Sequence, residues 1–237
     1  MNKRNILYRG LLCMMYLALC LVLLASCDDN GHYEVTEDTV CYRYWTFSYG
    51  YINDTLPEAD PKTFIDLKDW LGKDAHRVYF KEKQIKGADP NTIKAKKYPL
   101  CCDKKDYYFM GVAMNVADKE HFKVLHYDWN LWAKDSRYAY YDSTRVEVRN
   151  VKDFHVVDYC WATDNLDVYV FGELLPDADP KTFKHLENGY MRDKSHVWYI
   201  DSLIPDADPK TFKVDKEGNA SDKYGPFNYG KRENAEE

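Results

Sequence analysis

The sequence predicts a mainly β protein built from tandem repeats of about 29 residues, each holding short antiparallel strands and one helical turn. Three observations predict this fold. A hexapeptide recurs at a fixed spacing, an Asp–aromatic pair recurs in phase with it, and β-forming residues follow each such Asp. A unit of this length cannot bury a core alone, so neighbouring units must stack. The period does not decide between an open repeat stack and a closed ring.

The hexapeptide supplies the helical turn. Its copies have the sequence Ala-Asp-Pro-x-Thr-Phe or a close variant, and they begin at residues 59, 88, 117, 149, 178 and 207. The starts are 29 residues apart except for 32 between 117 and 149, so one unit carries a three-residue insertion. Asp suits a helix N-cap and Pro the first helical position, which makes Asp60, Asp89, Asp179 and Asp208 the predicted caps. A calcium site is the alternative, but each block offers one carboxylate where Ca²⁺ takes several oxygen ligands.

The second signature is a set of six residues that we call the phase aspartates, each five positions before an aromatic residue. They are Asp74, Asp103, Asp135, Asp164, Asp193 and Asp222, followed by Tyr79, Tyr108, Tyr140, Tyr169, Trp198 and Phe227. The segments after them, such as 168–171 and 197–200, are strand-like, and the phase aspartate itself lies in a turn. An apolar residue recurs eleven positions after each of the first five phase aspartates, at Ile85, Met114, Val146, Leu175 and Ile204, and Leu56 continues the spacing at the start of the array. Each unit is therefore expected to run strand, turn, strand, short strand, helical turn.

These segments resemble the DKNYY repeat family of bacterial proteins. The resemblance is carried by Asp-Lys-x-x-aromatic-aromatic segments, approximate in 103–109 (DKKDYYF) and 193–199 (DKSHVWY), followed by the Ala-Asp-Pro block. It covers about residues 45–230. The family has no established activity, so the resemblance implies a repeat architecture and supplies no catalytic residue.

The first 26 residues are predicted to be a bacterial lipoprotein signal peptide. Lys3, Arg4 and Arg9 precede an uncharged stretch over 11–25, which is too short for a comfortable bilayer span. The stretch ends in Leu-Ala-Ser-Cys, which resembles a lipobox and makes Cys27 the predicted lipid attachment residue. An ordinary signal peptide or a signal anchor is the alternative. Removing the segment would change the formal charge from −6 to −9.

The remaining boundaries follow from the repeat. Residues 27–44 are predicted to be the lipidated Cys and an acidic tether, residues 45–230 the repeat domain, and residues 231–237 a flexible tail. The predicted location is the bacterial cell envelope, with the protein lipid-anchored. Acidic residues directly after the lipidated Cys resemble an inner-membrane retention signal in some Gram-negative groups and a surface-export signal in other bacterial lipoproteins. The order Ser-Cys-Asp-Asp, with Asp28 and Asp29, is more similar to the second, which favours the outer membrane, at its surface or periplasmic face.

Four cysteines follow Cys27, namely Cys41, Cys101, Cys102 and Cys160. Disulfides and buried free thiols are both open for them. No CxxC pair occurs and the histidines are scattered, so no metal site is expected. No cofactor is expected either. The acidic balance argues against nucleic acid as a partner.

Two functions are compatible with this sequence. The first is a non-catalytic, membrane-anchored repeat domain that binds or scaffolds a protein or carbohydrate partner. The second is an envelope hydrolase acting on glycans through a carboxylate pair. No GxSxG, HExxH or P-loop occurs, so no catalytic residue is assigned. If an enzyme site interrupts the repeat, the place to look is the insertion over 123–134, which holds Trp129 and Trp132.

The exposure of the aromatic residues in a structure tests the binding function. The ring five positions after each phase aspartate is expected in the core. The next residue along the strand would face the other way. If Phe80, Phe109, Tyr141 and Tyr199 are exposed, they form a ladder of rings for a partner.

Overall fold

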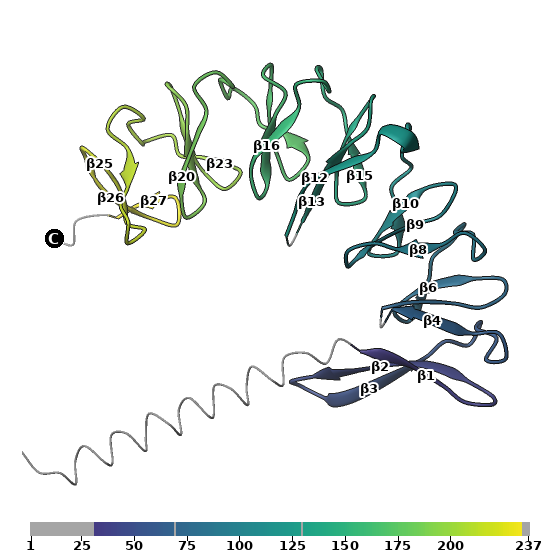
Figure 1. Ribbon diagram of the computed structural model, residues 1–237. Helices are drawn as coiled ribbons and strands as arrows, with labels where there is room; N and C mark the ends of the chain where they lie inside the picture. Colours follow the sequence, from purple (N-terminus) through teal and green to yellow (C-terminus); the bar gives the residue numbers. More distant parts are fainter. Residues whose placement is uncertain (1–30, 69, 129, 234–237) are drawn as a thin grey trace, which may run out of the picture. The chain divides into compact units, whose positions relative to one another are not determined.

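The computed structural model describes residues 31–68, 70–128 and 130–233, and these form a mainly β chain (Figure 1). The predicted fold class is confirmed: short antiparallel strands recur in tandem, and the described residues contain one helical element, the 3₁₀ helix η1 at Lys119–His121. The chain divides into two compact units, Met1–Lys105 and Asp106–Glu237.

The first unit begins with a three-stranded sheet in the order β1-β2-β3, followed by a four-stranded sheet in the order β4-β5-β6-β7. A hairpin of β8 and β9 ends this unit. The strands are β1 His32–Val35, β2 Val40–Thr46, β3 Gly50–Thr55, β4 Ile65–Lys68, β5 Leu71–Lys73, β6 Val78–Phe80, β7 Lys83–Gln84, β8 Lys94–Ala95 and β9 Leu100–Cys102.

The second unit begins with the β10–β11 hairpin and continues with four sheets, each a four-stranded antiparallel meander in chain order. The strands of the hairpin and the first two sheets are β10 Tyr107–Phe109, β11 Val112–Ala113, β12 Lys123–Tyr127, β13 Leu131–Lys134, β14 Ala139–Tyr141, β15 Thr144–Val146, β16 His155–Asp158, β17 Trp161–Thr163, β18 Val168–Val170 and β19 Glu173–Leu174. Those of the last two are β20 Lys184–Glu187, β21 Tyr190–Arg192, β22 Val197–Tyr199, β23 Ser202–Leu203, β24 Lys213–Val214, β25 Ala220–Asp222, β26 Gly225–Asn228 and β27 Lys231–Arg232.

Each four-stranded sheet therefore has one strand more than the sequence predicted for a repeat. The missed element is the strand directly after the Ala-Asp-Pro block, such as β4 or β20. It is an edge strand, mostly exposed or half-buried, so it lacks the apolar face that marks a strand in a sequence. The third and fourth strands meet in two-residue turns with positive φ, for example Phe171 at 51° and Gly172 at 83°. Such turns follow the right-handed twist of the strands.

Two predicted boundaries are wrong. Residues 32–46, largely assigned to the acidic tether, form β1 and β2, and Tyr33, Val40 and Tyr42 are buried there. The sequence signal failed because this sheet has no phase aspartate. At the other end, Lys231 and Arg232 form β27, so the first two residues of the predicted flexible tail are part of the last sheet. The rest of that segment, residues 234–237, lies outside the described residues.

The Ala-Asp-Pro blocks form the predicted capped turns. The carboxylate of Asp60 accepts the Lys62 N–H at 3.0 Å, and Asp179 does the same for Lys181 at 3.1 Å. The Phe183 N–H then reaches the Asp179 carbonyl at 2.9 Å, which closes one helical turn. The turn ends there because the next residue begins an edge strand. The 3₁₀ helix η1 lies in the decayed copy of the block at 117–122.

The core lies between consecutive sheets of one unit. One buried cluster joins Trp161 and Val168 of one repeat to Met191 and Trp198 of the next. The six aromatic residues predicted to be core are confirmed, since Tyr79, Tyr108, Tyr140, Tyr169, Trp198 and Phe227 are all buried. The recurrent apolar residues Leu56, Ile85, Met114, Val146, Leu175 and Ile204 are buried as well. Within each unit, neighbouring repeats therefore stack as predicted.

The packing between repeats gives a first prediction. Met191→Ala removes a side chain with no exposed surface from this cluster, so the free energy of unfolding should fall by about 2–5 kcal/mol. Met110→Ala is the matched control, because Met110 is 53% exposed and its truncation should change stability by no more than about 0.5 kcal/mol. Urea denaturation followed by circular dichroism measures both. Equal losses would contradict the stacked core.

Candidate binding surfaces

The phase aspartates are buried hydrogen-bond acceptors. Asp164 has no exposed surface, and its two oxygens accept five hydrogen bonds. The donors are the N–H groups of Leu166 at 2.9 Å, Asp167 at 2.7 Å, Arg149 at 2.9 Å and Asn150 at 2.9 Å, and the hydroxyl of Tyr169 at 3.2 Å. The carboxylate thus ties its own turn, the preceding block and the following strand together.

The same contact recurs along the chain. In each block the second residue donates its backbone N–H to the phase aspartate of that repeat. The pairs are Asp60–Asp74 at 3.1 Å, Asp89–Asp103 at 2.6 Å, Asp118–Asp135 at 2.9 Å, Asn150–Asp164 at 2.9 Å, Asp179–Asp193 at 2.8 Å and Asp208–Asp222 at 2.8 Å. In return, the block threonine accepts the N–H of the residue after the phase aspartate, as Thr182 does for Lys194 at 3.2 Å. The block and the turn therefore hold each other.

The lysine that follows several phase aspartates pairs with the capping aspartate of the block. Lys104 lies 3.1 Å from Asp89, Lys194 lies 2.8 Å from Asp179 and Lys223 lies 2.6 Å from Asp208. Lys194 and Lys223 lower the pKa of Asp179 and Asp208. The two residues of the Asp-Lys dipeptide thus have different roles. The Asp is the buried acceptor of backbone hydrogen bonds, and the Lys is the exposed counter-ion of the capping aspartate.

Hydrogen bonding keeps Asp74, Asp135 and Asp164 ionised. Burial alone would raise the pKa of Asp74, but N–H donors from His76, Asp60 and Arg77 outweigh it and lower the pKa. The pKa values of Asp135 and Asp164 are lowered against burial in the same way. The Tyr79 hydroxyl donates to Asp74 at 3.1 Å, and burial raises the pKa of that tyrosine. These carboxylates are committed to backbone donors, which is a structural use.

The last repeat uses a different donor. Phe227 stands where four other repeats have tyrosine and one has Trp198, and it has no hydroxyl. The Arg232 guanidinium from β27 takes its place and reaches Asp222 at 2.8 and 2.9 Å. Arg232 also pairs with Asp206 at 2.9 Å. This contact holds the end of the chain against the last sheet and explains why β27 is ordered.

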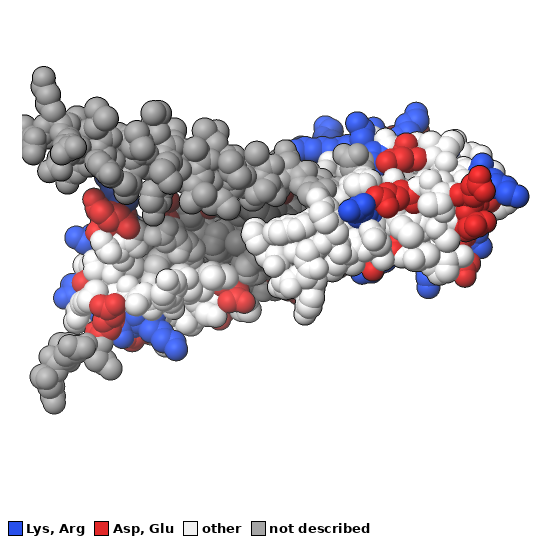
Figure 2. Space-filling model, turned by 90° about the horizontal axis from the view of Figure 1, so that it is seen from below, with Lys and Arg blue, Asp and Glu red and all other residues white. Residues whose placement is uncertain are grey.

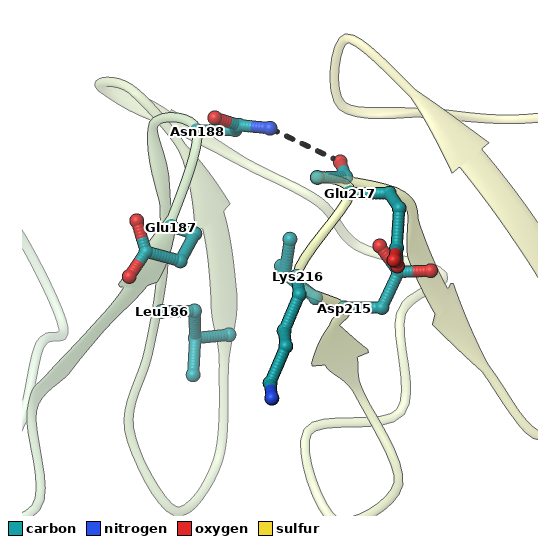
Figure 3. A pocket seen from close by; sticks show the side chains of 8 residues that line it. Leu186, Glu187, Asn188, Asp215, Lys216 and Glu217 are labelled. Carbon is teal, nitrogen blue, oxygen red and sulfur yellow. Dashed lines mark hydrogen bonds between the residues drawn. The ribbon is translucent and has the colours of Figure 1, made fainter.

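A shallow cavity of about 590 Å³ opens between the last two repeats (Figure 3). Leu186 and Lys216 face it from neighbouring repeats, and the Asn188 side chain closes its top with a 3.2 Å hydrogen bond to the Gly218 carbonyl. Its lining mixes three acidic residues with one lysine, and it holds no convergent set of buried polar groups. We assign it no chemistry.

A second groove, of about 460 Å³, lies between the same repeats and is basic. It is lined by Lys181, Thr182, Lys184, Arg192, Asp193, Lys194, Pro209 and Lys210. Asp193 is buried beneath it, and Lys194 is paired with Asp179. Lys181, Lys184 and Lys210 are exposed, and none of the three forms an ion pair with a residue that the structure describes. The groove therefore carries free positive charge on a chain whose net charge is −6.

An aromatic surface lies at the tip of the β2–β3 hairpin. Trp45, Phe47, Tyr49 and Tyr51 are 36%, 85%, 82% and 59% exposed. The rings of Trp45 and Phe47 meet edge to face with centroids 4.6 Å apart, and the Arg43 guanidinium lies 4.5 Å from the Tyr51 ring centroid. Figure 2, which views the molecule from the side of this hairpin, shows a lobe without charged residues there.

A search against protein families matches residues 35–202 to the DKNYY family. The chain belongs to the DKNYY family. The match confirms the resemblance read from the sequence, although the network of block and phase aspartate continues beyond it to Asp222. No curated protein and no solved structure matches the chain.

The predicted ladder of exposed rings is absent from the DKNYY repeats. Phe80 and Phe109 are buried, while Tyr141 and Tyr199 are half-buried. The reason is stacking: these rings pack on the next repeat of their unit, as Tyr141 does against Phe171 with ring centroids 6.2 Å apart. A group of neighbouring exposed rings lies instead at the β2–β3 hairpin, whereas other exposed rings such as Tyr224 and Tyr229 lie in the last repeat.

The insertion over 123–134 lengthens one hairpin and leaves the repeat intact. It forms β12, β13 and the connection between them, and the strands pair with Tyr127 opposite Leu131 and a register shift between Val124 and His126. Trp132 is fully buried, and its Nε1 donates to the Tyr159 carbonyl at 3.0 Å. Trp129 lies outside the described residues.

The four cysteines are free thiols in this structure. Cys101, Cys102 and Cys160 are buried and Cys41 is half-buried. Burial raises the pKa of the Cys101 and Cys160 thiols to about 12, which disfavours the reactive thiolate. Among the described residues no group of three or more His, Cys, Asp or Glu could hold a metal ion.

The predicted signal peptide and Cys27 lie outside the described residues. Within residues 31–68, 70–128 and 130–233, no helix is long and apolar enough to cross a bilayer. The lipid attachment residue is therefore taken up as a proposal below.

The phase-aspartate network gives a second prediction. Asp164→Asn keeps the shape but turns one oxygen into a donor that faces N–H groups, so the free energy of unfolding at neutral pH should fall by about 2–4 kcal/mol. The pKa of folded Asp164 is lowered, so its contribution is present above the unfolded value of about 3.9 and is lost as pH falls below it. The variant should therefore lose less stability on acidification than the parent protein.

Urea denaturation at a series of pH values from neutral to acidic measures both effects. Asp201→Asn is the matched control, because Asp201 is exposed and accepts one hydrogen bond, from the Ser202 hydroxyl. It should leave stability and its pH dependence unchanged. An unchanged acid slope in Asp164→Asn would contradict the proposed role of the phase aspartates.

Proposed function

We propose that this protein is a lipid-anchored protein of the bacterial cell envelope whose DKNYY domain is a non-catalytic binding module for anionic groups on a protein or carbohydrate partner. The observation that carries the proposal is the basic groove between the last two repeats. Its lysines come from consecutive copies of the block, Lys181 and Lys184 at one copy and Lys210 at the next. Lysine side chains bind phosphate, sulfate or carboxylate as point charges.

The rest of the molecule supports a binding role. The phase aspartates are held by backbone donors, so they serve the fold of every repeat and not one reaction centre. Consecutive stacked repeats present a rigid surface on which charged side chains keep their spacing. A basic groove on an acidic chain also selects its partner, because the remaining surface repels anions.

The anchor is supported by the sequence alone. The uncharged stretch over 11–25 ends in Leu-Ala-Ser-Cys, and acyl chains on Cys27 would contribute about 0.8 kcal/mol per buried CH₂ to membrane binding. The location we propose is the outer membrane, at its surface or periplasmic face.

A third prediction tests the anchor. Cys27→Ser should abolish incorporation of radiolabelled palmitate, because the thiol that takes the lipid is gone. Cys20→Ser is the matched control, since Cys20 lies in the same predicted signal peptide and should leave labelling unchanged. Labelling of the Cys27→Ser protein, or loss of labelling in Cys20→Ser alone, would overturn the anchor. Protease treatment of intact cells then separates the two faces of the membrane.

A fourth prediction tests the groove, with heparin as the anionic probe and neutral dextran as the uncharged one. Lys181→Glu/Lys184→Glu/Lys210→Glu should weaken binding to heparin by about tenfold or more, which corresponds to about 1.4 kcal/mol. The parent protein should not bind dextran, and added salt should weaken its binding to heparin.

The matched control reverses three exposed lysines of the first unit, Lys62, Lys86 and Lys94. An equal loss in both triple variants would show that net charge alone governs binding and would overturn the groove. Shortening of the polysaccharide during incubation would overturn the non-catalytic role and favour the glycan hydrolase.

A further inference from the structure

The β2–β3 hairpin is longer than the repeats around it. β2 has seven residues and β3 six, whereas β5 and β6 in the next sheet have three each. At about 3.3 Å per residue, the excess carries the tip roughly 10 Å beyond the length of the neighbouring strands. Its outer residues have no strand of equal length to pack on, which is why the rings at the tip are exposed.

The tip is an uncharged aromatic surface. From Tyr44 to Ile52 the sequence has no charged residue, and five of these nine residues are Tyr, Trp or Phe. Trp45 pairs with Tyr51 across the strands, so both rings lie on the same face of the hairpin with Phe47. Soluble proteins seldom leave such a cluster in water unless it has a partner.

The register of β1 shows what lies beside the tip. β1 is antiparallel to β2, with His32 opposite Arg43 and Val35 opposite Val40. The first residue of β1 therefore lies at the end of the sheet that leads to the tip. Cys27 is five residues before His32, so an extended connection spans at most about 18 Å. The tip lies four residues beyond Arg43, about 13 Å along β2.

We propose that the hairpin tip, Tyr44–Ile52, inserts its aromatic rings into the lipid–water interface beside the acyl chains of Cys27. The inference rests on the lipid anchor of the proposed function. Trp and Tyr favour this interface because each ring has an apolar body and a polar edge. The acyl chains hold the protein at the membrane, and the hairpin fixes how the first sheet is oriented on it.

The absence of charge at the tip defines the lipid chemistry. With no lysine between Tyr44 and Ile52, contact depends on apolar burial and not on attraction to anionic lipid. Arg43, over the Tyr51 ring, lies at the level where the phosphate groups of a bilayer begin. Insertion should therefore occur in zwitterionic phosphatidylcholine alone.

The test uses the full lipidated protein reconstituted in phosphatidylcholine vesicles, with either ordinary or brominated acyl chains. Trp45 is the reporter, because it is 36% exposed and subtracting the fluorescence of Trp45→Phe removes the contribution of the other five Trp residues. Its signal is the fluorescence difference between the parent protein and Trp45→Phe. Brominated chains should lower this signal by roughly twofold or more, because a ring at the acyl boundary contacts the quencher.

Two double variants make the comparison specific. Phe47→Ser/Tyr49→Ser should abolish the quenching of Trp45. Tyr224→Ser/Tyr229→Ser removes two rings that are 67% and 76% exposed in the last repeat, and it should leave the quenching unchanged. Circular dichroism should show the same fold in both, because all four side chains lie at the surface.

The outcomes separate this inference from the anchor. Protein that floats with the vesicles while its Trp45 signal is the same in both lipids overturns the hairpin proposal and leaves the anchor standing. Protein that does not float overturns both. If Trp45 becomes shielded in lipid-free detergent as protein concentration rises, or on addition of dextran, the tip binds a second copy or a glycan and the proposal is wrong.

Discussion

The fold depends on a buried carboxylate that accepts backbone N–H groups from two segments about 14 residues apart. A buried charge of this kind is tolerable only when it is fully hydrogen-bonded, and each donor it satisfies would otherwise be a buried, unpaired N–H group. At Asp164 these conditions are met together by its own turn, by Arg149 and Asn150, and by Tyr169. All of these hydrogen bonds join residues of the same repeat that are close in the sequence, so the network forms within each repeat. Stacking of the apolar faces then joins the repeats.

This interaction also explains what could be predicted from the sequence. Residues that serve the network must recur, so the period located the capped turns, the core rings and the strands on either side of each phase aspartate. The edge strand after the block was missed because segments such as Lys184–Glu187 have no apolar face of their own. The first sheet was missed because it lacks the aspartate, although Tyr33 and Tyr42 build a core there by ring packing at 5.1 Å.

The candidate surfaces were harder to predict for the same reason. A period reports what all repeats share, whereas a binding surface is a place where one repeat differs. The half-buried state of Tyr141 and Tyr199 depends on which neighbour covers each strand, and a single strand cannot reveal this. The basic groove needs two copies of the block to lie side by side with Lys184 between them. The hairpin could have been recognised from the sequence by its length, because the run of aromatic residues over 42–51 is longer than the aromatic run of any other repeat.

The charge distribution relates the two candidate binding surfaces, the hairpin tip and the basic groove, to the rest of the molecule. An acidic domain held close to a bilayer by its lipid would be repelled by anionic headgroups, and this repulsion falls off over about a Debye length. An uncharged hairpin can meet the interface without that cost. A groove with free lysines can bind anionic groups that the rest of the acidic surface repels. The network needs many carboxylates, which makes the chain acidic. The hairpin tip has no charged residue, and the one carboxylate in the lining of the basic groove, that of Asp193, is buried in the network, so neither surface presents an exposed negative charge of its own.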